Sequence, residues 1–133
     1  MKQNKSELSE LRKEMHELLA ELQRLLSVLS SRKPMLRGTV YVLRRRCGKE
    51  RCRCCDGELH QTEVFSCTEG GVRVLRPVRG AEKERLRKLT GQYRRFRTAR
   101  IRLRKIFQRL LAIVNAFEEA RLAEGRKCKR HGE

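Results

Sequence analysis

Four cysteines and one histidine lie within residues 43–60, near the middle of the chain. Thiolate and imidazole groups are the ligands that zinc prefers, and a structural zinc site takes four of them in a tetrahedron. Glycines at positions 48 and 57 allow two tight turns that could bring such ligands together. The spacing C-x4-C-x-C-x5-H therefore predicts one structural Zn²⁺ ion, bound by Cys47, Cys52, Cys54 and His60.

Other interpretations of these cysteines stay open at this point. They could be partly buried thiols in a small sheet, or a redox site, which the adjacent Cys54 and Cys55 would favour. Cys55 could also replace Cys54 or His60 as a ligand, and Cys67 could reach the site from a neighbouring strand. Near the C-terminus, Cys128 and His131 give a C-x2-H pattern that is too small to bind a metal ion alone.

The second chemical feature is an excess of arginine. Six basic residues surround the cysteines within residues 43–60, and eleven basic residues with no acidic one occupy residues 85–109. A helix that needs only solvation mixes both signs of charge, so this pattern indicates phosphate binding. The alternative is a solvated face that pairs in part with glutamates of the first helix. We predict phosphate contacts from Arg44, Arg45, Arg46, Arg51, Arg53, Arg94, Arg95, Arg97, Arg102 and Arg104.

The overall charge points to the same class of partner. The 133 residues carry 34 basic and 16 acidic side chains, a formal net charge of +18. Such a chain seeks polyanions, of which nucleic acid is the first candidate and an anionic membrane surface the second. We expect DNA rather than RNA. No apolar run is long enough to span a membrane, and the first ten residues lack the apolar core of a secretory signal, so we expect a cytoplasmic protein.

Two helices are expected to position these residues. In residues 1–33, apolar side chains recur at spacings of three and four, which predicts a coiled-coil helix that ends before Pro34. Glutamates recur every seven residues beside this seam, at Glu7, Glu14 and Glu21. The predicted seam consists of Leu8, Leu11, Met15, Leu18, Leu22, Leu25 and Leu29.

A longer basic coiled-coil helix is predicted over residues 81–125, with a polar tail over 126–133. Gly125 is expected to end it. One seam position is charged, and a charged seam residue can specify register at a cost in stability. The predicted seam consists of Leu86, Leu89, Tyr93, Phe96, Arg100, Leu103, Phe107, Leu110, Val114 and Phe117. We expect the protein to form a homo-oligomer through these coiled-coil seams.

Between the helices, residues 34–80 have the composition of a small β-rich insert. Three runs rich in β-branched residues predict strands at 39–43, 62–67 and 72–76, and Glu69-Gly70-Gly71 predicts a hairpin turn. The fold class is therefore α+β, mainly α. Two long coiled-coil helices flank a small antiparallel sheet that carries a Cys/His zinc knuckle.

The segment "MLRGTVYVLRRRCGKERCRCCDGELH" resembles a group of small prokaryotic proteins of unknown function. The group shares the pattern C-G-K-x-x-C-x-C, a glycine and a histidine, then a short sheet and a long coiled-coil helix. The resemblance covers about residues 35–117. This chain has an additional cysteine at Cys55 and lacks the aromatic pair that follows the histidine. The group is often encoded beside transposase-like genes, which implies a mobile-element context and DNA.

No catalytic constellation is visible, because the three histidines lie far apart and no phosphate-binding loop is present in the sequence. We therefore expect a non-enzymatic nucleic-acid-binding accessory protein with no catalytic residues. The alternative is a coiled-coil adaptor whose charge docks an acidic protein partner, such as a transposase or recombinase subunit.

Overall fold

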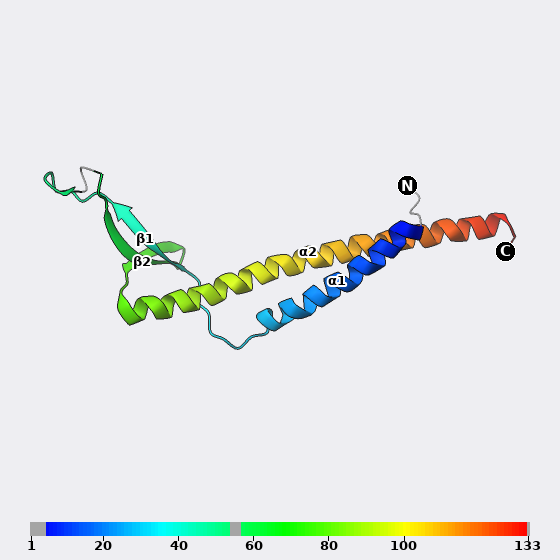
Figure 1. Ribbon diagram of the computed structural model, residues 1–133, viewed down its shortest axis with the longest axis horizontal. Coiled ribbons are helices and arrows are strands. Elements are labelled where there is room, and N and C mark those ends of the chain that lie inside the picture. Colours follow the sequence, from blue (N-terminus) through cyan, green and yellow to red (C-terminus); the bar gives the residue numbers. More distant parts are fainter. Residues whose placement is uncertain (1–4, 54–56, 133) are drawn as a thin grey trace. The chain divides into compact units, whose positions relative to one another are not determined.

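The computed structural model describes residues 5–53 and 57–132. It is an α+β fold, mainly helical, with two helices and one three-stranded antiparallel sheet (Figure 1). The chain divides into two compact units. The helical hairpin combines α1 with α2 from Phe96 onwards, and the sheet unit spans Arg32–Arg95. The elements are α1 (Lys5–Leu29), β1 (Thr39–Arg45), β2 (His60–Glu69), β3 (Val72–Pro77) and α2 (Gly80–Arg130).

The predicted seam of α1 is the face that α1 buries. All seven seam residues are buried or half-buried, and Leu18 is the most enclosed of them. Leu18 forms the core of the helical hairpin with Ile106 and Ile113 of α2, which are 0% and 1% exposed. This apolar contact stabilises the hairpin, because most helical stability in proteins comes from tertiary packing of an apolar face.

On the buried face of α2, every second position of the predicted seam from Arg100 onwards is shifted by one residue toward the N-terminus. Ala99, Ile106 and Ile113 point into the core, whereas the predicted Arg100, Phe107 and Val114 are exposed. Phe107 and Val114 are 55% and 48% exposed. Both patterns share Leu103, Leu110 and Phe117, and the observed one still alternates spacings of four and three. The predicted charged seam position is therefore wrong, because Ala99 fills the place assigned to Arg100.

Two bidentate ion pairs join the helices along one flank of the hairpin. Arg109 donates from Nε and Nη2 to the two carboxylate oxygens of Glu14, at 2.8 and 2.7 Å. Arg102 donates in the same way to Glu21, at 2.5 and 2.7 Å. Glu21 lies seven residues after Glu14 on α1, whereas its partner Arg102 lies seven residues before Arg109 on α2. The two helices therefore run antiparallel.

These ion pairs predict a pH dependence for the hairpin. The hydrogen bonds from Arg109 and Arg102 lower the pKa of the Glu14 and Glu21 carboxyl groups below the ordinary value of 4.5. A carboxyl with a lower pKa in the folded state stabilises that state above its unfolded pKa, and this stabilisation is lost as pH falls through the folded pKa. We expect the melting temperature of the hairpin to fall on acidification below about pH 4.5.

The check is thermal unfolding, followed by far-ultraviolet circular dichroism at several pH values. The double variant Glu14→Gln/Glu21→Gln should lose less stability than the wild type over the same acid range, because its amides do not titrate. An equal loss in both proteins would contradict this role of the two glutamates.

The three strands form the sheet in the order β1-β2-β3. They confirm the three predicted strand segments and extend each of them, the third by one residue. Gly70 and Gly71 connect β2 to β3 with φ angles of +55° and +81°, as a two-residue hairpin turn requires. In the register, Val40 faces Phe65 and Tyr41 faces Val64, so alternate residues lie on opposite faces of the sheet.

One face of the sheet packs against the start of α2, and we call it the inner face. Phe65 of β2 forms a buried cluster with Val78 and Leu86, and Val40 and Cys67 pack against this cluster. Gly38 lies so close to β2 that a Cβ atom would come within 2.6 Å of the Phe65 ring. The strand that leads into the cysteine-containing loop is thereby held close to the core.

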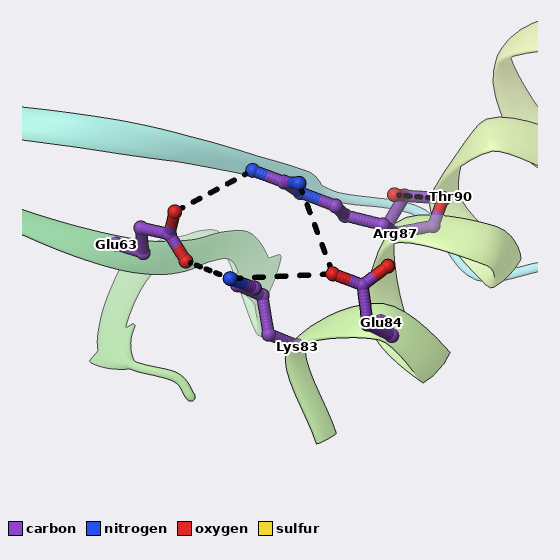
Figure 2. A network of polar contacts seen from close by, with 5 residues as sticks. All are labelled: Glu63, Lys83, Glu84, Arg87 and Thr90. Carbon is purple, nitrogen blue, oxygen red and sulfur yellow. Dashed lines mark hydrogen bonds and ion pairs between the residues drawn. The ribbon is translucent and has the colours of Figure 1, made fainter. Parts of the chain in front are cut away.

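Charged side chains extend this contact beyond the apolar cluster (Figure 2). Glu63, on the inner face of β2, contacts Lys83 at 2.8 Å and Arg87 at 3.7 Å. Both cations also approach Glu84, and the hydrogen bond from Lys83 lowers the pKa of the Glu63 carboxyl. The basic residues at the start of α2 are therefore partly neutralised by the inner face.

Helix α2 ends later than the sequence indicates. It continues through Gly125 and ends at Arg130, so the expected polar tail over residues 126–133 begins as helix. Lys127, Lys129 and Arg130 lie in its last turn, where positive charge interacts favourably with the helix dipole. Within residues 5–53 and 57–132, neither helix is long and apolar enough to cross a membrane.

Candidate metal centre

The sheet closes the base of the loop that carries the cysteines. Strand β1 ends at Arg45 and β2 begins at His60, and these two residues are direct partners in the antiparallel register. The intervening residues 46–59, which we call the knuckle loop, therefore start and end at neighbouring points. Cys47 follows two residues after the end of β1, and Gly57 turns with a φ of +104° before the chain enters β2.

Three of the four predicted ligands come together in this loop. The donor atoms of Cys47, Cys52 and His60 all lie within 4.8 Å of one another. The Sγ atom of Cys52 and the Nε2 atom of His60 are 2.9 Å apart, in hydrogen-bond contact. The two thiols are half-buried and the imidazole is exposed, so solvent reaches the site from the histidine side.

The donor set and its spacing fit zinc. In a tetrahedral zinc site with standard bond lengths, two sulfur ligands lie about 3.8 Å apart and a sulfur and a nitrogen about 3.6 Å apart. The Cys52–His60 contact would have to lengthen by about 0.7 Å to admit the ion. Two thiolates and one imidazole are borderline-soft ligands, which favour zinc over magnesium or calcium.

The other cysteines can now be placed, with two exceptions. Cys54, the fourth predicted ligand, and Cys55 lie outside the described residues. Cys67 lies seven residues beyond His60 on β2, about 23 Å along the strand. It packs on the inner-face cluster, where burial and then the Glu69 carboxylate raise the pKa of its thiol. It is not in the metal group, and neither is the exposed Cys128.

Exposed arginines surround this group of donors. We call Arg44, Arg45, Arg46, Arg51 and Arg53 the knuckle arginines. All five are exposed, and none makes an ion pair with a carboxylate in the part of the chain that the structure describes. Their positive charge is therefore not compensated by described acidic side chains, which is an arrangement suited to an anionic ligand.

The predicted arginines of α2 fall into two groups. Arg94, Arg95, Arg97 and Arg104 are exposed, and again no carboxylate pairs with them among the described residues. Arg102 differs, because both of its donors are taken up by Glu21. The same holds for Arg109 with Glu14. The seven-residue spacing of the glutamates, matched by that of Arg102 and Arg109, was a signal for this pairing.

No family model matches the chain, and no similar protein was found among curated proteins or solved structures.

Proposed function

We propose that this protein is a non-enzymatic nucleic-acid-binding accessory protein whose arginine-rich knuckle loop is held in shape by Zn²⁺. The observation that carries the proposal is the juxtaposition of three zinc-type donors with five exposed arginines, three in the knuckle loop and two at the end of β1 that leads into it. The donors would fix the loop, and the loop would fix the directions in which the arginines reach phosphate groups.

The metal would act as a structural cross-link. Residues 46–59 include few apolar side chains, and a loop of this size cannot bury enough apolar surface to order itself. Cys47, Cys52 and His60 would hold the ion, and Cys54 remains the proposed fourth ligand. Cross-linking the loop lowers the entropy cost of presenting the knuckle arginines to a ligand.

The arginines of α2 would provide further phosphate contacts. Arg94, Arg95, Arg97 and Arg104 are exposed, and guanidinium groups bind phosphate through paired hydrogen bonds. Few side chains that read base edges accompany them, so we propose phosphate contact without sequence readout, and DNA as the preferred partner. We omit Arg102 from these contacts, because its ion pair with Glu21 competes with phosphate.

The helical hairpin would serve as the scaffold, as an antiparallel coiled coil within one chain. The seven-residue repeat of its buried positions and the ion pairs beside them support this description. Since the two seams pack on each other, self-association of the protein would have to use another surface.

A mobile-element setting, which the resemblance implies, and a cytoplasmic location are part of the proposal. The alternative function is an adaptor that uses the same positive surface to dock an acidic protein such as a recombinase subunit. The two differ in salt dependence toward DNA, because counterion release makes phosphate binding weaken steeply as salt rises.

The test is binding of the zinc-loaded full chain to a labelled DNA duplex, measured by fluorescence anisotropy at several salt concentrations. We expect a linear decrease of log K with log salt. The variant Arg44→Gln/Arg45→Gln/Arg46→Gln should reduce the slope by about 2–3, since each phosphate contact contributes about 0.9. The control Arg102→Gln should leave the slope within about 0.5 of wild type.

Equal slopes for the triple variant and the wild type would contradict the assignment to the knuckle. Failure of the wild type to bind DNA even at about 50 mM salt would favour the adaptor.

A further inference from the structure

The face of the sheet opposite the inner face, which we call the outer face, has a distinct composition. Both glutamates of the strands, Glu63 and Glu69, share the inner face with Phe65. The outer face of the three strands carries no carboxylate. In the register, it presents Tyr41, Leu43, Arg45, His60, Arg73 and Leu75. It therefore combines positive charge with an exposed leucine, Leu75, and a half-buried tyrosine, Tyr41.

Tyr41 and Arg73 meet across the central strand. Arg73 donates from Nη2 to the Tyr41 hydroxyl at 3.2 Å and from Nε to the Ser66 hydroxyl at 3.1 Å. Tyr41 lies on β1 and Arg73 on β3, with β2 between them, and the two are offset along the strands, since Tyr41 pairs with Val64 and Arg73 with Thr68. The two side chains must therefore lean toward each other over β2. Ser66 and Val64, on the same face of β2, are only 9% and 4% exposed.

The Tyr41 side chain is only half-buried, so part of it remains accessible on the outer face. Its hydroxyl accepts a hydrogen bond from Arg73, which restricts rotation of the ring. An accessible aromatic ring that is held in place is a platform on which an unpaired base can stack.

Arg73 keeps its charge available for an anion. Its two side-chain partners, Ser66 and Tyr41, are neutral hydroxyl groups, so the guanidinium is oriented without being neutralised. Arg76, on the same strand but on the inner face, forms an ion pair with Glu82. The two arginines are three residues apart, and they differ in whether a carboxylate neutralises their charge.

The outer face is also contiguous with the metal site. Arg45 and His60 are partners at the end of the same face, and His60 contacts Cys52 in the knuckle loop. Four residues along β1 separate Arg45 from Tyr41, a distance of about 13 Å. A strand of nucleic acid could therefore contact Arg45 and Tyr41 together.

We propose that the outer face binds single-stranded nucleic acid, with a base stacked on Tyr41 and phosphates contacted by Arg73 and Arg45. This inference rests on the proposed function and narrows its ligand, because a base within a duplex is already stacked and cannot use the Tyr41 ring. Stacking accepts any base, which agrees with a surface that lacks side chains for reading base edges.

The test measures binding of the zinc-loaded full chain to an oligothymidylate of about 15 nucleotides and to a duplex of equal length. Tyr41→Leu should weaken binding to the single strand by about 10-fold and binding to the duplex by less than about 2-fold. Tyr41→Phe, which keeps the ring, should stay within about 3-fold of wild type. Arg73→Gln should weaken single-strand binding by about 5-fold, and the matched control Arg76→Gln by less than about 2-fold.

A measurement on the wild type guards against variants that fail to fold. Photocrosslinking to an oligonucleotide that contains 5-bromouracil should place the crosslink at Tyr41. Crosslinks only on other residues, or wild-type binding of the oligothymidylate by Tyr41→Leu and Arg73→Gln, would overturn the outer-face proposal. The proposed function would survive that result if duplex binding still depended on the knuckle arginines. Absence of binding to either nucleic acid at about 50 mM salt would overturn both.

Discussion

Serine in place of Cys52 is expected to lower the affinity for zinc by at least about 100-fold. Cys52 is half-buried within the donor group, and its Sγ atom lies 2.9 Å from Nε2 of His60. A serine hydroxyl is not deprotonated near neutral pH and is a poor ligand for zinc, so one of the described donors is lost. The helical hairpin should keep its stability, because it forms a separate compact unit.

The measurement is zinc stoichiometry after gel filtration, together with competition against a chelator of known affinity. Cys128→Ser is the matched control, since Cys128 is exposed and lies outside the donor group. It should bind zinc as the wild type does. If Cys52→Ser retained one zinc ion at wild-type affinity, the assignment of the metal centre would be wrong.

The second large effect is expected at the core of the hairpin. Ile106 is 0% exposed and packs with Leu18 and Ile113. Removing its side chain beyond Cβ leaves a cavity, so Ile106→Ala should lower the free energy of unfolding by about 2–5 kcal/mol. The adjacent Phe107 is 55% exposed, and Phe107→Ala should change that free energy by no more than about 0.5 kcal/mol.

Urea unfolding, followed by far-ultraviolet circular dichroism, compares the two variants. The control, Phe107→Ala, removes the larger side chain. Residue size alone would therefore predict the greater loss of unfolding free energy in the control, whereas burial predicts it in Ile106→Ala. A greater loss in Phe107→Ala than in Ile106→Ala would show that the helices pack in the other register, with Phe107 inward.

The same pair of residues explains what the sequence could and could not predict about the helices. On α1 a single row of leucines fits the three-four pattern, and that row is the buried face. On α2 two rows fit, because Leu103, Leu110 and Phe117 belong to both. The larger Phe107 and Val114 favoured the wrong row, although the correct row contains Ala99 where the wrong one contains a charged Arg100. Avoiding a charged seam position would have selected the correct pattern.

The sheet and the metal centre show a similar division. Composition and the Gly70-Gly71 turn were sufficient to predict the three strands, and cysteine spacing predicted the group of Cys47, Cys52 and His60. The contact between Tyr41 and Arg73 was not predictable in the same way. It depends on the pairing register of three strands, and a shift of one residue would move every side chain to the other face.

Ion pairs between the helices were only the alternative interpretation of the basic residues in the sequence. The glutamates of α1 were recognised as a repeat beside the seam, but Arg102 was assigned to phosphate binding. Pairing of Arg102 with Glu21 needs the antiparallel orientation of the helices, which the sequence does not specify. The separation between arginines that stabilise the hairpin and arginines left for a ligand therefore comes from the structure.

The proposal that zinc shapes the knuckle loop for phosphate binding can be tested on the full chain. The measurement compares the affinity of the zinc-loaded and chelator-treated forms for a DNA duplex, at one moderate salt concentration. We expect zinc removal to weaken binding by more than about 10-fold, because Arg46, Arg51 and Arg53 of the knuckle loop lose their fixed arrangement while the net charge of the chain remains positive. Equal affinity in the two forms would contradict the proposal.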